Sequence, residues 1–213
     1  MFAFGVCIGN EEKYRSTAEP ALMRTVRSGD QIIEVRRQSS IHLAYNRIID
    51  QVREQKDLEG LILLHEDLEI RDALFRSKVK SAFLGDKVGI VGSIGAVGVN
   101  SLAWWEGQIR GALSETRFRV VGDLNNTEVE VVDGSLLCIA PWIVQQVHFD
   151  ETHFSGFHGY DADICFSVRE LGGRVIWTDL DLFHWAKGGF GDLNSFLKND
   201  CAFRKKWAHM IGR

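Results

Sequence analysis

The chain has 213 residues, of which 45% are hydrophobic and 25% charged, and its formal net charge at pH 7 is -4. This length is enough for one well-buried domain, and the scattered Lys and Arg residues exclude a basic surface for nucleic acid. No apolar run approaches the roughly 18 residues that a membrane-spanning helix needs. The opening segment "MFAFGVCIGN" has neither the basic start nor the cleavage pattern of a signal peptide, so we expect a soluble, cytoplasmic protein.

The first half of the chain alternates short apolar runs with helical patterns. Residues 2–9 and 32–35 are typical of short strands, and the polar letters "NEEKY" after the first of them predict a loop. Ser39 or Ser40 suits the N-cap of a following helix, whose apolar residues continue at helical spacing to Val52.

The segment "EGLILLHEDLEI" contains an unbroken aliphatic run, which predicts a central strand covered on both faces. Adjacent side chains on a strand point to opposite faces, so Ile62 and Leu63 should both be buried. A helix is expected within residues 71–83. Residues 87–101 then predict a strand that runs into a glycine-rich loop, where glycine permits tight turns or close backbone approach.

The second half has a different pattern. Residues 118–144 alternate polar and apolar side chains between turn signals and predict strands in hairpins. Residues 160–171 predict a helix ended by paired glycines, and residues 174–185 predict another strand before the flexible loop "AKGGFGD". We therefore expect one α/β domain with a mainly parallel sheet followed by a more mixed β region.

The four cysteines are Cys7, Cys138, Cys165 and Cys201, and no two of them have CxxC spacing. The first three lie in apolar segments, where a thiol behaves as a small hydrophobic group. The sequence therefore predicts neither a zinc knuckle nor a disulfide scaffold.

The letters "HED" follow the predicted central strand, at the edge of the sheet where ligands gather in α/β proteins. Residues two apart on a strand share a face, so His65 and Asp67 can converge on one ion while Glu66 points elsewhere. An imidazole with a carboxylate suits a divalent ion such as Mn²⁺. Taken alone, this segment favours a polar strand end facing water, since polar residues at a strand terminus are common.

Two later segments add further candidate ligands. Asp161 and Asp163 lie at the start of a predicted helix, where the helix dipole favours a carboxylate, although one of them can be a simple cap. His184 ends a strand between aromatic residues, a position that more often holds a packed histidine than a metal ligand.

The order of "HED", "VDGSLLCI", "HFDE", "FSGFHGYDADIC" and "DLFHW" resembles glycosyltransferase family 2 proteins of the GT-A fold. More narrowly, the chain is similar to bacterial glycosyltransferase-like proteins with His-x-Asp in place of Asp-x-Asp. The resemblance covers nearly the whole chain. It implies a Rossmann-like nucleotide-diphospho-sugar transferase fold with a mixed, mostly parallel central sheet. It also implies one domain over 1–213, with a nucleotide-binding half over about 1–100 and an acceptor and catalytic half over about 101–213.

The activity that this resemblance implies is metal-dependent transfer of a hexose from a nucleotide-diphospho-sugar to a hydroxyl acceptor. The expected donor is a UDP-sugar. The acceptor would be a glycan in bacterial surface polysaccharide synthesis. The metal ion would be Mn²⁺ or Mg²⁺, and the reaction would be an inverting single displacement. Two alternatives stay open. One is a non-catalytic module that binds a nucleotide sugar or glycan. The other is a nucleotidyltransferase or hydrolase of related fold, although "CIGNEEKY" is short of the glycines and basic residues usual in nucleotidyltransferases.

The resemblance also implies residue roles. Asp67 and His184 would hold the metal, His65 would bind the metal or the nucleotide ribose, and Asp161 would be the general base. The donor-binding residues would be Asn10, Glu11, Ser40, Asn46, His65 and Asp133, the last beside Gly134 near the sugar. Ser40 and Asn46 fit a helix cap and an exposed helical residue equally well.

Aromatic residues and a loop complete the predicted site. Trp104, Trp105, Trp185 and Tyr160 are candidates for stacking on sugar rings, and core packing is the more common role for at least two of them. The loop over residues 186–192 is expected to close over the donor and exclude water.

Overall fold

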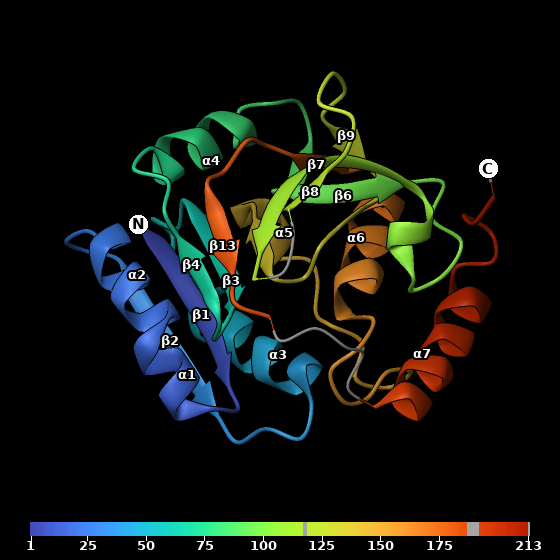
Figure 1. Cartoon of the computed structure of the whole chain (residues 1–213), viewed down its shortest axis with the longest axis horizontal. Helices are drawn as coiled ribbons and strands as arrows, with labels where there is room; N and C mark the ends of the chain where they lie inside the picture. The colour runs from blue at the N-terminus through green and yellow to red at the C-terminus, as the bar shows by residue number, and fades with distance from the viewer. Residues whose placement is uncertain (117–118, 187–191, 213) are drawn as a thin grey trace.

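The computed structural model describes residues 1–116, 119–186 and 192–212 and contains two β-sheets with helices around them (Figure 1). The larger sheet has the order β2-β1-β3-β11-β5-β12-β9. Its strands are β1 (Phe2–Ile8), β2 (Gln31–Arg36), β3 (Gly60–His65), β5 (Val88–Gly92), β9 (Glu128–Val129), β11 (Leu136–Ile139) and β12 (Arg174–Trp177).

The smaller sheet has the order β10-β6-β7-β13-β4, and β8 pairs with β7. Its strands are β4 (Leu68–Ile70), β6 (Ile94–Val97), β7 (Gln108–Glu115), β8 (Arg119–Val121), β10 (Val131–Val132) and β13 (Leu182–His184). The helices are α1 (Glu11–Ser16), α2 (Ala18–Thr25), α3 (Ile41–Val52), α4 (Phe75–Phe83), α5 (Pro141–Val144), α6 (Tyr160–Glu170) and α7 (Leu193–Lys206), with a 3-10 turn η1 (Trp104–Glu106).

Strand β3 lies inside the larger sheet, as its aliphatic run predicts. It pairs in parallel with β1 and antiparallel with β11. Ile62 and Leu63 are both 0% exposed, so the prediction that both faces of this strand are covered is confirmed. The mixed, mostly parallel sheet expected from the sequence is also found, because β1 pairs in parallel with β2 and β12 with β5, whereas β11 runs antiparallel to both of its neighbours.

The first predicted helix is confirmed as α3, which packs on β1 and β2. Its N-cap is Ser40, whose hydroxyl accepts a 3.2 Å hydrogen bond from the backbone N–H of His42. Close packing of helix on sheet depends on Gly5 in β1, because a Cβ there would lie 2.7 Å from Cγ2 of Ile48.

The prediction of a loop at "NEEKY" is wrong, because the segment forms α1, and α2 follows it. Asn10 caps α1 by accepting a 3.0 Å hydrogen bond from the backbone N–H of Lys13. Glu11 and Glu12 occupy the first turn, where the helix dipole favours acidic side chains. Figure 1 shows α1 and α2 beside β1 and β2 at one side of the molecule, and α7 at the other.

The glycine-rich loop predicted after β5 is also wrong in part, since residues 94–97 form β6. A Cβ on Gly95 would lie 2.1 Å from the carbonyl oxygen of Val131, so glycine lets β6 approach β10 closely. The single strand expected over residues 174–185 divides into β12 and β13, which belong to different sheets. Strand β7 and helix α7 were not predicted.

A buried hydrophobic cluster includes side chains of both sheets, for example Leu64 of β3 and Leu113 of β7. Among the described residues, no helix combines the length and the apolar character that crossing a membrane requires.

Candidate active site

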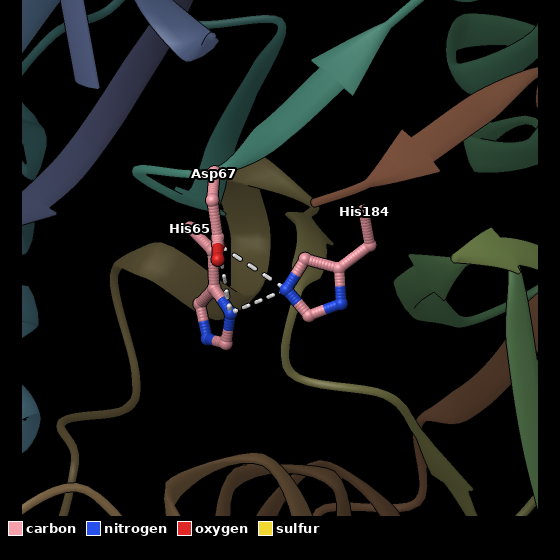
Figure 2. A group of neighbouring side chains, drawn as sticks. All are labelled: His65, Asp67 and His184. Atoms are coloured by element: carbon pink, nitrogen blue, oxygen red, sulfur yellow. Dashed lines mark hydrogen bonds and ion pairs between the residues drawn. The ribbon is translucent and has the colours of Figure 1, made fainter. Parts of the chain in front are cut away.

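Three predicted metal ligands meet where β3 and β13 end (Figure 2). His184 Nε2 lies 3.2 Å from Asp67 Oδ1 and 3.3 Å from His65 Nδ1. His65 Nδ1 and Asp67 Oδ1 are 3.9 Å apart. His65 and Asp67 converge as predicted, although β3 stops at His65 and Asp67 lies in the turn before β4. The antiparallel pairing of β4 with β13 brings His184 opposite Leu68 and hence beside Asp67.

The chemistry of this cluster fits a divalent metal ion. One ligand atom from each of the three residues lies within 4.8 Å of the other two. Atoms that each bind one ion at about 2.0–2.3 Å lie about 3–4 Å from one another, which is close to the spacing found here. Two imidazoles and a carboxylate are suitable ligands for Mn²⁺ or Zn²⁺.

The charges in the cluster are strongly coupled. Burial raises the pKa of Asp67, but its hydrogen bond with His184 and the charges of His65 and His184 outweigh that effect and hold the pKa well below its usual range. Burial lowers the pKa of His184, yet the hydrogen bonds to Asp67 and Glu115 raise it to about 10. Burial and the charge of His184 lower the pKa of His65 to about 4. Asp67 is therefore ionised and His65 neutral at pH 7.

Two residues that the sequence did not single out contact the cluster. Glu115 Oε1 lies 3.2 Å from Nδ1 of His184, on the side of the ring opposite Asp67. A carboxylate there fixes the orientation of a metal-binding imidazole and leaves its other nitrogen for the ion. Lys13 Nζ donates a 2.6 Å hydrogen bond to Asp67 Oδ2. Both contacts depend on elements that were not predicted, β7 for Glu115 and α1 for Lys13.

Tyr160 connects the cluster to α6 instead of offering a stacking surface. Its side chain is buried, and its Oη lies 2.6 Å from His65 Nε2. A Cβ on Gly134 would lie 2.2 Å from the same Oη, so glycine is required beside it. Trp104 is buried as well, whereas Trp105 and Trp185 are 38% and 44% exposed.

A cavity of about 560 Å³ adjoins the cluster. Its described lining includes seven titratable side chains: His65, Glu115, Asp133, His158, Tyr160, Asp161 and His184. Burial, and next the negative charge of Asp133, raise the pKa of Asp161 to about 7. A carboxyl group with such a pKa can accept a proton near neutral pH and is more basic than an ordinary aspartate. The predicted base, a predicted sugar-side residue and two predicted metal ligands therefore share one cavity.

Asp163 has a different role from Asp161, although both lie in the first turn of α6. Its buried carboxylate accepts a 2.8 Å hydrogen bond from Nε1 of Trp207 and forms a 2.8 Å ion pair with Lys206. The ammonium group of Lys206 also bonds Asp150 at 2.8 Å. Asp163 therefore anchors α6 to the C-terminal end of α7 and is not a simple helix cap.

The other predicted donor-binding residues contact the protein itself. Asn10 and Ser40 cap α1 and α3, and Glu11 pairs with Arg36 at 2.8 Å. The alternative that Asn46 is an exposed helical residue is wrong, because it is 8% exposed and exchanges hydrogen bonds of 2.8 and 2.9 Å with the backbone of Phe149. These four do not occur among the described residues that line the 560 Å³ cavity. Most of the predicted closing loop, residues 187–191, lies outside the described residues.

A model of the family described as "glycosyltransferase like family" matches residues 3–202. The chain belongs to this glycosyltransferase-like family. A family relationship of this extent supports glycosyl transfer as the reaction class and agrees with the resemblance read from the motifs. The chain is also 33% identical over 211 residues to the streptomycin biosynthesis protein StrF of Streptomyces griseus, covering 97% of this chain and 75% of that protein.

Solved structures place this glycosyltransferase-like chain in the GT-A fold. The crystal structure of GalNAc-T7 with UDP, GalNAc and Mn²⁺ superposes with a TM-score of 0.65 at 11% identity, over 99% of this chain and 49% of that one. The crystal structure of A197 from STIV gives a TM-score of 0.56 at 14% identity, over 87% of this chain and 86% of that one. At such identities the likeness shows the fold alone, and the predicted fold is confirmed.

Proposed function

We propose that the chain is a metal-dependent glycosyltransferase that moves a hexose from a nucleotide-diphospho-sugar to a hydroxyl acceptor, with inversion at the anomeric carbon. The observation that carries this proposal is a cavity of about 560 Å³ lined by Asp161 and by two members of the metal cluster, His65 and His184, with Asp67 beside them. Donor activation and proton removal are the two chemical tasks of the reaction, and both have candidate groups here.

Asp67, His65 and His184 would hold the ion. A divalent ion bound there supplies positive charge that stabilises the diphosphate leaving group. Two imidazole ligands favour Mn²⁺ over Mg²⁺, which prefers oxygen ligands. The GalNAc-T7 structure, which contains UDP and Mn²⁺, supports UDP-sugars and Mn²⁺ as the first donor and ion to test.

Asp161 would act as the general base. The acceptor oxygen attacks the anomeric carbon while the proton of the acceptor hydroxyl passes to the Asp161 carboxylate. The bond from the anomeric carbon to the diphosphate oxygen breaks at the same time. The nucleoside diphosphate leaves with the bonding electrons. One attack from the face opposite the leaving group inverts the anomeric centre. Asp133 supports this role because its charge helps to raise the pKa of Asp161.

The nucleotide would lie against the first half of the chain, about residues 1–100 of the single domain that we propose. A recess of about 250 Å³ beside the metal cluster supports this position, and it is lined in part by Cys7, Gly9, Tyr45 and Glu66. Tyr45 has a buried hydroxyl with no hydrogen-bond partner among the described residues. Direct roles for Asn10, Glu11, Ser40 and Asn46 in binding the nucleotide stay predictions.

We also propose the biological process in which the transfer takes place. Surface polysaccharide synthesis follows from the family resemblance, and the name of the StrF relative supports synthesis of a small natural product as the second setting.

The proposal is tested by incubating the chain with a panel of UDP-sugars, with and without Mn²⁺, and identifying products by mass spectrometry. We expect UDP release that depends on Mn²⁺ and rises with a suitable acceptor. UMP with sugar 1-phosphate would indicate a hydrolase that cleaves the diphosphate with water. Sugar 1-phosphate with a uridylylated product would indicate a nucleotidyltransferase. Donor binding without any release would indicate the non-catalytic binding module.

A further inference from the structure

We propose that the apolar lining of the cavity binds an acceptor that carries a compact hydrophobic ring system next to its reacting hydroxyl, instead of a polysaccharide chain. This inference rests on the proposed function and narrows its acceptor. The lining of the cavity includes Asp161 and His184, and most of its remaining lining is apolar. Six of the apolar lining residues are Leu102, Trp104, Trp105, Ile109, Leu113 and Phe157.

Hydrogen bonding separates the two kinds of acceptor. The side chains of Leu102, Ile109 and Leu113 carry no donor or acceptor group, and these three residues lie on the same cavity as the base. A glycan presents several hydroxyl groups on every sugar, and each one that leaves water without a new partner costs free energy. A hydrophobic ring has no such cost and gains from leaving water. The apolar side chains that line the cavity therefore favour an acceptor with an apolar group next to its reacting hydroxyl.

Large aromatic side chains are also exposed at this cavity. Trp105 is 38% and Phe157 51% exposed, although both are large and apolar. The Trp104 and Trp105 rings meet edge to face, with centroids 5.8 Å apart. Aromatic side chains provide broad, rigid surfaces for ring-shaped ligands, and neighbouring exposed apolar groups commonly mark a binding site.

The size of the cavity agrees with a compact acceptor. Its volume of about 560 Å³ lies inside the range of roughly 300–1,000 Å³ that holds one small organic ligand. The hexose of the donor must share this space, because its anomeric carbon has to lie within reach of the acceptor oxygen near Asp161. The remaining room suits one or two fused rings.

The test compares two acceptors that differ only in the apolar group with one apolar and one glycan acceptor. 2-Naphthyl β-glucoside and methyl β-glucoside have the same sugar hydroxyls, 2-naphthol offers a ring hydroxyl alone, and maltotriose represents a glycan. Binding of each is measured by calorimetry on the full chain with UDP and Mn²⁺, and transfer by mass spectrometry with UDP-glucose, UDP-galactose and UDP-N-acetylglucosamine. We expect the naphthyl compounds to bind about 10-fold or more tightly than methyl glucoside, and maltotriose to bind weakest.

Two variants connect the preference to the cavity. Trp105→Ala and Phe157→Ala should each weaken binding of naphthyl glucoside by about 10-fold, because truncating a large aromatic contact commonly has this effect. The affinity for UDP should not change in Trp105→Ala. Phe157 also lines the recess of about 250 Å³ that we propose for the nucleotide, so the comparison with UDP affinity rests on Trp105→Ala. Leu171→Ala is the matched control, since Leu171 is 49% exposed and is not among the described residues that line this cavity.

The proposal is overturned if methyl and naphthyl glucoside bind equally, if maltotriose binds best, or if Leu171→Ala weakens naphthyl binding as much as Trp105→Ala. Binding is measured directly, so the answer does not depend on finding the natural donor. UDP affinity in the presence and absence of Mn²⁺ is measured separately. A failure there contradicts the proposed function and is distinguished from a wrong acceptor class.

Discussion

His184 Nε2 and Asp67 Oδ1 lie 3.2 Å apart, although 117 positions separate the two residues in the sequence (Figure 2). Their side chains and that of His65 form one potential ligand set. We therefore predict that Asp67→Ala and His184→Ala each lower the affinity for Mn²⁺ by more than about 100-fold, beyond the roughly 10–100-fold typical of residues that only support a ligand. Calorimetric titration with Mn²⁺ measures the effect.

The control for this experiment is Glu69→Gln, because Glu69 lies on the adjoining strand β4 and pairs with Arg71 and Arg24. Its Mn²⁺ affinity should equal that of the unaltered chain. Circular dichroism of all three variants separates loss of the ion from loss of the fold. Unchanged Mn²⁺ affinity in folded Asp67→Ala would exclude the metal site.

Glu115 should support the same ion without contacting it. In Glu115→Gln the side chain keeps its shape but loses the negative charge that holds Nδ1 of His184. We expect Mn²⁺ affinity to fall about 10–100-fold, the range usual for a residue that orients a metal ligand. Calorimetry on Glu115→Gln and Glu115→Asp makes the comparison, and Asp should restore part of the affinity. An effect as large as that of His184→Ala would instead identify Glu115 as a direct ligand.

The anchor between α6 and α7 should contribute to stability. In Lys206→Met the buried carboxylate of Asp163 keeps its hydrogen bond from Trp207 but loses its ion pair with the Lys206 ammonium group. Losing a hydrogen bond to a charged group costs about 2 kcal/mol, so the free energy of unfolding should fall by about that amount. Urea unfolding measures it. Asp163→Asn combined with Lys206→Met should cost less than the sum of the single changes, because the two residues interact directly.

The sequence predicted the members of the candidate site that lie in recognisable motifs, and it missed the neighbours that only strand pairing brings close. His65, Asp67, Asp161 and His184 lie in recognisable motifs, and the aliphatic run before His65 predicted the central strand. Strand pairing is a long-range property, so nothing local to Glu115 indicates that β7 runs beside β13 and brings it opposite His184.

Two further errors have local physical reasons. The helix α1, which carries Lys13, has only 6 residues and one buried side chain, so its apolar periodicity is too weak to reveal it. The segment containing Gly95 resembles a loop by composition, yet its glycine serves close strand approach in β6. Glycine content alone does not distinguish these two uses.

Asp161 leads to a prediction about pH. A base works only when ionised, and the pKa of Asp161 is raised to about 7 by burial and by the charge of Asp133. The transfer rate should therefore rise with pH and reach half of its maximum near pH 7. Asp133→Asn removes one cause of the raised pKa, so the midpoint should move to lower pH. Asp161→Asn should lower turnover by about 10²–10⁴-fold while UDP affinity, measured by calorimetry, is retained.

Stability gives an independent measure of the same pKa. An unfolded aspartate has a pKa of about 3.9, so between that pH and about 7 the folded chain binds a proton at Asp161 that the unfolded chain has lost. Stability contributed by this group is complete at low pH and declines as pH rises through that interval. Asp161→Asn lacks this decline, so its melting temperature relative to the unaltered chain should increase between pH 5 and pH 8. A constant difference across this interval would show that Asp161 titrates at an ordinary pKa, and the pH dependence of transfer would then require another group.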